Sequence, residues 1–240
     1  MDMANKCAIV LIEIISQEES MRRYKLLLSI MAAVIILVGC ENSKNNTNNN
    51  LETENESLNT YSFNEDGIIL SEDGKRLVED IAFKVIDALS KKDFKTLSSY
   101  IHSVKGVSFS PYTYINKETN LVFDKEKLRN FMEDNTEYHW GVYDGRGDDI
   151  ILTPAAYYDE FIYSADFKNA EEVSYNKTLS FGNMKANEHE IYENAIVVEF
   201  YFSGFNEEYE GIDWKSLKLV FQEESGNWKL VCIINNEWTV

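Results

Sequence analysis

Apolar residues recur every three or four positions in the stretch that follows Ser71. This spacing places their side chains on one face of an α-helix. Ser71 is expected to cap the helix, with Glu72 and Asp73 in its first turn, where acidic side chains favour the helix dipole. The stripe consists of Leu77, Val78, Ile81, Val85, Ile86 and Leu89.

Three shorter helices are predicted from their capping residues. Asp93 and Asp124 each precede a short amphipathic segment, and Thr153 precedes Pro154, a residue favoured in the first helical turn. The side chains expected to face inward are Phe94, Leu97 and Ile101 in the first, Leu128, Phe131 and Met132 in the second, and Tyr157, Tyr158 and Phe161 in the third.

The C-terminal third of the chain has the patterns of β-strands. Residues 195–202 are almost continuously apolar and aromatic. Residues 214–222 alternate, with Leu217, Leu219 and Phe221 on one face and Lys218 and Gln222 on the other. A turn at residues 224–227 leads into a third strand, residues 228–234, so these strands are predicted to form an antiparallel meander.

Further strands are predicted upstream. Residues 106–110 and 174–181 are candidates, and residues 137–143 and 150–152 flank a glycine- and aspartate-rich turn typical of a hairpin. Helices first and antiparallel strands last predict an α+β fold, with N-terminal helices packed on a curved, mostly antiparallel sheet. Residues 61–240 are long enough for a single domain of this kind.

The N-terminal segment has the features of an export signal. Arg22, Arg23 and Lys25 precede an apolar run over residues 26–38, which is shorter than the ~20 residues needed to span a bilayer. Leu37-Val38-Gly39-Cys40 resembles the lipobox of bacterial lipoproteins. This resemblance implies that residues 21–39 are a signal peptide, and that Cys40 is lipidated and holds the protein at the extracytoplasmic face of the cell membrane.

The residues on either side of this signal are expected to lie outside the folded domain. Residues 1–20 fit poorly in front of an export signal, so translation is predicted to start at Met21, although Met1 stays the alternative. Residues 41–60 are rich in Asn, Glu, Ser and Thr, a composition that buries too little apolar surface to fold. We therefore expect residues 40–60 to form a lipidated, disordered linker.

The net charge of the chain indicates which classes of partner it would repel. Its 41 acidic and 23 basic residues give a net charge of −18, which disfavours phosphate backbones, so no nucleic acid partner is expected. No phosphate loop, dinucleotide fingerprint or zinc-ligand spacing is present, and no cofactor or metal is predicted. The three histidines, His102, His139 and His189, are isolated, and His189 is expected in a solvated turn.

The order of elements resembles the nuclear-transport-factor-2-like cone, a curved sheet wrapped around a long helix. The segments at residues 105–112, 140–145 and 236–239 are also similar to lipoproteins of Gram-positive bacteria whose function is unknown. The cone resemblance implies a pocket at the open end of the sheet. Aromatic residues expected to line that pocket are Phe109, Tyr112, Tyr114, Trp140 and Tyr143.

Two functions remain open from the sequence. One is a non-catalytic, lipid-anchored domain that binds a small molecule or a protein. The alternative is an enzyme of the cone fold, a hydrolase, isomerase or dehydratase, in which Asp144, His102 and Tyr112 are the catalytic candidates. The absence of a catalytic signature favours the binding domain.

Overall fold

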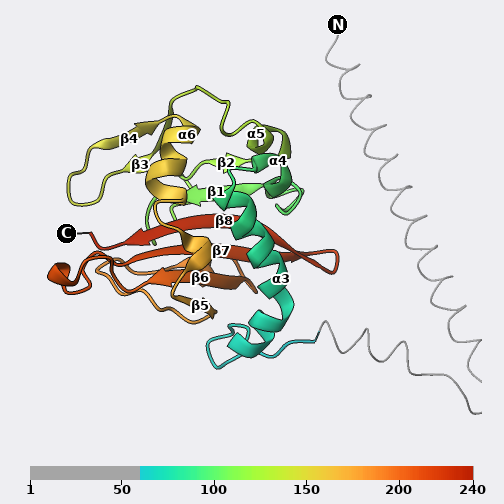
Figure 1. Cartoon of the computed structure of the whole chain (residues 1–240). Coiled ribbons are helices and arrows are strands. Elements are labelled where there is room, and N and C mark those ends of the chain that lie inside the picture. Colours follow the sequence, from blue (N-terminus) through green and yellow to red (C-terminus); the bar gives the residue numbers. More distant parts are fainter. Residues whose placement is uncertain (1–59, 240) are drawn as a thin grey trace, which may run out of the picture. The chain divides into compact units, whose positions relative to one another are not determined.

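The computed structural model describes residues 60–239, which form a main sheet with a long helix across one face (Figure 1). The predictions for residues 1–59, including the signal peptide, Cys40 and the linker, lie outside the described residues. The α-helices are α3 (Ser71–Ser90), α4 (Phe94–Leu97), α5 (Lys125–Arg129), α6 (Pro154–Tyr157) and α7 (Glu188–Ile191). A π-helix, η1 (Tyr158–Ile162), continues α6, and η2 (Phe167–Asn169) and η3 (Glu207–Tyr209) are 3-10 helices. The strands are β1 (Val107–Ser110), β2 (Val122–Phe123), β3 (Tyr138–Val142), β4 (Asp149–Leu152), β5 (Glu172–Tyr175), β6 (Ile196–Phe202), β7 (Lys215–Glu224) and β8 (Asn227–Glu237).

Six strands form the main sheet in the order β2-β1-β8-β7-β6-β5. All neighbouring pairs are antiparallel except β1 and β8, which run parallel. The meander predicted from the C-terminal third is confirmed as β6, β7 and β8, and the predicted hairpin is confirmed as the separate pair β3 and β4. The α+β fold class is therefore confirmed.

The long helix α3 lies across one face of the main sheet (Figure 1). Its predicted apolar stripe faces inward, where Val78, Val85, Ile86 and Leu89 are fully buried. Gly74 allows the helix to approach the strands, since a Cβ atom there would lie 3.3 Å from Cγ2 of Ile196. A larger side chain at this position would push α3 away from β6.

Three of the four predicted caps are confirmed. The side chains of Asp93, Asp124 and Thr153 accept hydrogen bonds from the backbone N–H groups of Thr96, Lys127 and Ala156. The prediction for Ser71 is wrong, because α3 begins at Ser71 and no side chain caps it. Instead, the carboxylate of Asp73 accepts a hydrogen bond from the backbone N–H of Ser62 (2.9 Å), which fastens the preceding loop to the helix.

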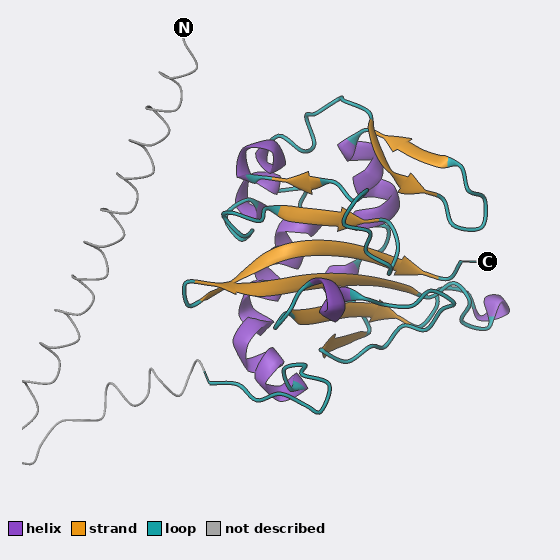
Figure 2. Cartoon of the chain, turned by 180° about the vertical axis from the view of Figure 1, so that it is seen from behind, coloured by secondary structure: helices purple, strands orange, loops and turns teal. Residues whose placement is uncertain are grey.

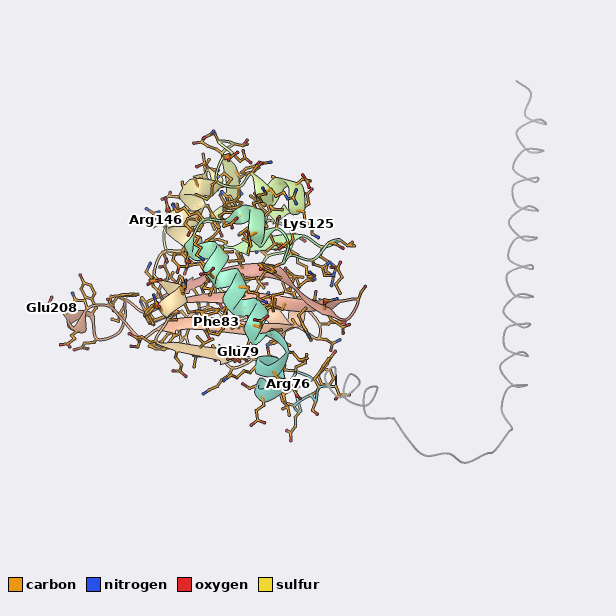
Figure 3. All side chains as sticks on the ribbon, turned by 45° about the vertical axis from the view of Figure 1, so that its right-hand side comes forward. Arg76, Glu79, Phe83, Lys125, Arg146 and Glu208 are labelled. Atoms are coloured by element: carbon orange, nitrogen blue, oxygen red, sulfur yellow. The ribbon has the colours of Figure 1, made fainter. Side chains whose placement is uncertain are left out.

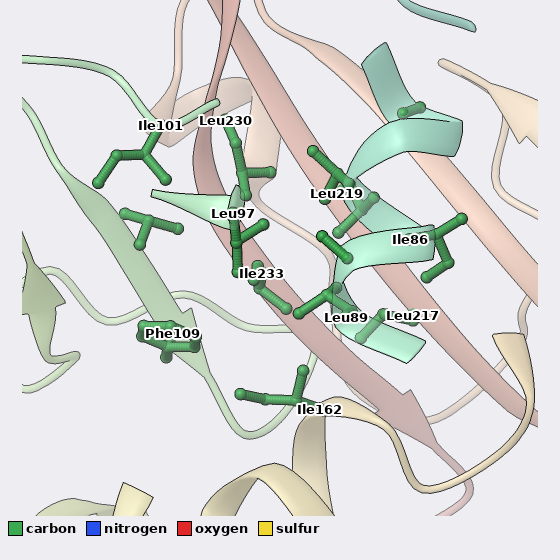
Figure 4. Packing of buried hydrophobic residues seen from close by; sticks show 14 of the residues in the cluster. Ile86, Leu89, Leu97, Ile101, Phe109, Ile162, Leu217, Leu219, Leu230 and Ile233 are labelled. Atoms are coloured by element: carbon green, nitrogen blue, oxygen red, sulfur yellow. The ribbon is translucent and has the colours of Figure 1, made fainter. Parts of the chain in front are cut away.

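A single large hydrophobic core fills the space between α3, α4, α6 and the sheet (Figure 4). Leu217, Leu219 and Phe221 enter it from β7, as predicted from their alternation. Helix α4 ends at Leu97, earlier than predicted. Ile101 is nevertheless fully buried, because it forms a β-bridge with Leu230.

The opposite face of the sheet is also covered. Figure 2 views the sheet from this side and shows loops and a short helix lying over the strands. A second apolar cluster forms there, and its buried members are Ile115, Ala195, Val197, Val220, Val231, Cys232 and Ile234. Lys218, predicted on this face, is only 1% exposed and pairs with Glu188 of α7 at 3.0 Å.

The strand predicted over residues 174–181 is shorter than expected. β5 ends at Tyr175, and Asn176 adopts a left-handed conformation (φ 49°) that turns the chain. The segment that follows is held by a side chain, because buried Glu199 accepts hydrogen bonds from the backbone N–H groups of Leu179 and Ser180. A carboxylate thus replaces the β-ladder that the sequence pattern predicted.

Burial raises the pKa of the Cys232 thiol to about 12. This thiol therefore stays protonated at neutral pH, and Cys232 packs as a small buried hydrophobic residue. Within residues 60–239, no helix combines the length and apolar character needed to cross a membrane.

Candidate functional site: a cleft beside the β3–β4 hairpin

A cleft of about 390 Å³ lies between the β3–β4 hairpin and the segment that follows β1. We call it the hairpin cleft. Its volume lies within the ~300–1,000 Å³ range of small-molecule sites in proteins. Its walls are formed by Pro111, Tyr112, Tyr114, Asn116, Thr119, Asn120, His139, Trp140, Gly141, Val142, Tyr143, Asp144, Gly145, Gly147 and Met184.

The hairpin side of the cleft is shaped by its turn. The backbone N–H of Tyr143 donates to the carbonyl of Asp148, and the N–H of Gly147 donates back to the carbonyl of Tyr143, both at 2.8 Å. Arg146, labelled in Figure 3, places its guanidinium 4.1 Å from the centre of the Tyr143 ring. This cation–π contact holds the turn against the aromatic wall.

The opposite wall is held rigidly by buried polar side chains. Ser110 donates from its hydroxyl to the carbonyls of Tyr112 and Tyr114, and the amide of Asn235 donates to the carbonyl of Pro111. The Asn187 side chain both donates to the carbonyl of Ile115 and accepts from its N–H. These bonds satisfy the backbone of a segment that has no regular secondary structure.

Four of the five predicted aromatic residues line the hairpin cleft, namely Tyr112, Tyr114, Trp140 and Tyr143. Phe109 does not, because it is 1% exposed and packs in the main core against Trp140, with ring centres 5.9 Å apart. The Trp140 ring also stacks on Tyr157, with ring centres 3.8 Å apart. The Trp140 ring therefore belongs both to the core and to the cleft wall. The cleft is thus built directly on the core.

Two phenols in the cleft are kept in their neutral form. Burial, followed by the nearby carboxylates of Glu237, Asp144 and Glu160, raises the pKa of Tyr112. Burial and then Glu160 raise the pKa of Tyr143. Both hydroxyl groups are therefore protonated at neutral pH.

The three catalytic candidates do not meet in the hairpin cleft. Asp144 and Tyr112 do, because the backbone N–H of Asp144 donates to the Tyr112 hydroxyl at 3.3 Å. His102 is absent from the lining of the hairpin cleft. It is 8% exposed, and its Nδ1 accepts hydrogen bonds from the backbone N–H groups of Val104 and Lys105, both at 3.2 Å.

His102 therefore has a structural role in the turn that leads into β1. Oε1 of the Glu224 carboxylate also lies 3.3 Å from Nδ1 of His102. The turn closes at Gly106 (φ 66°), where a Cβ atom would lie 2.5 Å from the carbonyl oxygen of Phe123.

The other two histidines differ in their surroundings. His139 lies on the hairpin, with Nε2 3.0 Å from Oδ1 of Asp149 on the paired strand. His189 belongs to α7 and is half-buried rather than in a solvated turn, and this burial lowers its pKa. Over residues 60–239, no group of three or more His, Cys, Asp or Glu side chains is arranged to hold a metal ion.

Sequence reasoning missed part of the lining. Asn116, Thr119, Asn120 and Met184 come from irregular segments with no periodic pattern. The nitrogen of the Asn120 side chain is buried and has no hydrogen-bond partner among the described residues, so it is a donor that a ligand could use. No pattern in the sequence singled out these four residues.

The chain matches no protein-family model and no curated protein sequence. Among solved structures, one described as a calcium/calmodulin-dependent protein kinase II association domain from Xanthomonas campestris is 9% identical, with a TM-score of 0.28 over 67% of this chain and 84% of that one. A designed protein whose title names nuclear transport factor 2 is 10% identical, with a TM-score of 0.27 over 66% of this chain and 96% of that one. Scores this low support no argument from either protein. The structure itself defines an α+β domain with a ligand-sized surface cleft.

Proposed function

We propose that this protein is a non-catalytic binding domain, anchored by lipid at Cys40 to the extracytoplasmic face of the cell membrane. The observation that carries the binding role is the hairpin cleft, which combines aromatic walls with few polar groups. The nuclear-transport-factor-2-like relationship is part of this proposal. It is supported by a long helix laid across a mostly antiparallel sheet.

The charges around the cleft indicate the kind of ligand. Asp144 borders the cleft directly, and Glu160 and Glu237 lie close enough to affect its phenols. Arg146, the basic residue of the hairpin turn, is stacked on Tyr143. An anion would therefore meet a negative surface, so a flat molecule without negative charge is the ligand that this cleft favours.

An enzymatic role is the alternative, and one contact favours it. The Tyr112 hydroxyl and Asp144 lie together in the cleft, as an acid–base pair in a hydrolase, isomerase or dehydratase would. However, Tyr112 meets the backbone of Asp144 rather than its carboxylate, and the ring nitrogen of His102 is committed to a turn. We therefore prefer binding without chemical change.

Tyr114 and Tyr209 make a matched pair for testing the cleft, with side chains 53% and 56% exposed. Tyr114→Ala is expected to weaken binding of 4-ethylphenol roughly tenfold, because it removes an aromatic wall. Tyr209→Ala, on the loop between β6 and β7, is the control and should bind like the wild type. Calorimetric titration of the full chain in lipid nanodiscs, with empty discs subtracted, measures both. Equal affinities in the two variants would contradict the proposed site.

The anchor is tested separately, since Cys40 lies outside the described residues. Cells fed an alkyne analogue of palmitate are expected to label the wild-type protein, and Cys40→Ala should lose the label. Cys232→Ala is the control, because the Cys232 thiol is fully buried and protonated. Mass spectrometry should find the mature chain beginning at a diacylated Cys40. Label retained in Cys40→Ala would remove the basis for membrane anchoring.

A further inference from the structure

A small polar cavity of about 50 Å³ lies beside the hairpin cleft. We call it the inner chamber. Tyr112 and Met184 line both spaces, so they form the boundary between them. The remaining walls include Thr113 from the segment after β1, Ser180 from the loop after β5, and Lys218 from β7. Lys218 places this chamber on the face of the sheet opposite α3.

Buried hydrogen-bond donors surround the inner chamber. Thr113 is 4% exposed, and its hydroxyl has no hydrogen-bond partner among the described residues. Lys218 is 1% exposed and makes one bond, to Oε1 of Glu188 at 3.0 Å, out of the three that an ammonium group can donate. Ser180 accepts a bond from the Asn236 side chain at 2.7 Å, which leaves its own proton to donate.

Unpaired donors inside a protein are costly, so this arrangement calls for an acceptor. A volume of about 50 Å³ exceeds the ~10–15 Å³ needed to hold one water molecule, so the chamber has room for a small chemical group. A small group containing one oxygen atom fits this space.

The surrounding charges exclude an anion as that group. The charge of Lys218 is balanced by Glu188, whose second oxygen is buried without a partner among residues 60–239. Glu199 adds a buried carboxylate that accepts bonds from the Ser180 N–H and the Ser216 hydroxyl. A ligand carboxylate would therefore enter a region that already has a net negative charge.

We propose that the inner chamber binds the carbonyl oxygen of an uncharged ligand whose flat, apolar body lies in the hairpin cleft. The inference rests on the proposed function, because it extends the same site. Tyr112 and Met184 are the residues between the two parts, and a methionine side chain adapts its shape to what it contacts. Thr113 and Lys218 then select ligands that carry a carbonyl group.

Three related phenols test this assignment by calorimetry on the full chain in lipid nanodiscs at pH 6. The first, 4-hydroxyacetophenone, differs from 4-ethylphenol by one carbonyl oxygen, and 4-hydroxybenzoate carries a negative charge. The wild type is expected to bind 4-hydroxyacetophenone roughly fivefold more tightly than 4-ethylphenol, the scale of one net hydrogen bond. It should bind 4-hydroxybenzoate most weakly.

Thr113→Val removes only the hydroxyl and is expected to bring the affinity ratio of 4-hydroxyacetophenone to 4-ethylphenol down to about one. Thr113→Ser keeps a hydroxyl and should keep the preference. Thr136→Val, an exposed position outside both spaces, is the matched control. Thermal melting of each variant verifies that it is folded.

The outcomes separate the two proposals. If 4-ethylphenol binds but the wild type shows no carbonyl preference, or Thr113→Val keeps it, the inner chamber is not the carbonyl site. Tighter binding of 4-hydroxybenzoate would overturn the choice of an uncharged ligand. If none of the phenols binds, the hairpin cleft fails as a ligand site and the inference fails with it.

Discussion

Replacing Lys218 by methionine is expected to lower the free energy of unfolding by about 3–5 kcal/mol, the usual cost of breaking a buried ion pair from one side. The reason is that the substitution leaves the Glu188 carboxylate without its cation. Glu188 is 5% exposed, and its second oxygen has no other partner among the described residues. Without Lys218 its carboxylate would be buried and unpaired. Urea-induced unfolding followed by circular dichroism measures the loss.

A second variant and a control make this result specific. Adding Glu188→Leu to Lys218→Met removes both charges and is expected to recover most of the lost stability. Lys215 pairs with Glu237 at 3.1 Å, but both side chains are 28% exposed, so Lys215→Met should cost only about 0–1 kcal/mol. Similar losses for Lys215→Met and Lys218→Met would mean that the buried pair contributes no more to stability than the exposed pair.

Trp140→Ala is expected to lower the free energy of unfolding by about 3–5 kcal/mol, as large-to-small changes of core aromatic residues do. Trp140 is 1% exposed and stacks between Tyr157 and Phe123, with ring centres 3.8 and 5.8 Å away. Its indole N–H also donates to the carbonyl of Leu152 at 2.8 Å. The change therefore opens a cavity and leaves a backbone carbonyl of β4 without its donor.

Trp238→Ala is the matched control, because Trp238 is half-buried near the C-terminal end of the chain. It should lower the free energy of unfolding much less than Trp140→Ala does in the same urea titration. Trp140→Phe keeps a ring in the core and is expected to lie between the two. If Trp140→Ala and Trp238→Ala were equally stable, the hairpin would not be fastened to the core through this ring.

The sequence was most informative where structure depends on neighbouring residues. The caps Asp93, Asp124 and Thr153 were predicted correctly, because a capping side chain acts on N–H groups three residues away. The stripe of α3 and the alternation of β7 were also read correctly from their periods. Ser71 failed as a cap because the helix begins one residue earlier than predicted, with Leu70 at the N-cap position.

Features that depend on contacts between residues far apart in the sequence could not be predicted from such local patterns. The second covered face of the sheet needs α7 to reach β7, thirty residues further along the chain. One signal was present, since Leu230 to Ile234 are apolar at every position, a pattern of strands buried on both faces. The partner of Lys218 had no comparable signal, because charged residues near a turn are usually solvated.

The residues of the candidate site were also predictable only in part. The aromatic residues of the cleft could be proposed because Trp140 and Tyr143 precede a recognisable turn, and Tyr112 and Tyr114 follow a predicted strand. The inner chamber could not, since Thr113, Ser180 and Lys218 meet only after the loop following β5 has crossed the sheet. His102 was a candidate by residue type alone, and its backbone contacts explain its burial.

The sheet ends in very short strands on both sides, two residues in β2 and four in β5. Such edges offer little unpaired backbone to a neighbouring molecule, which limits strand-to-strand aggregation. A lipid anchor would concentrate many copies in one plane, where exposed strand edges would pair and aggregate most readily. The short edges, together with the net charge of −18 on the full chain, would keep neighbouring copies of the protein apart.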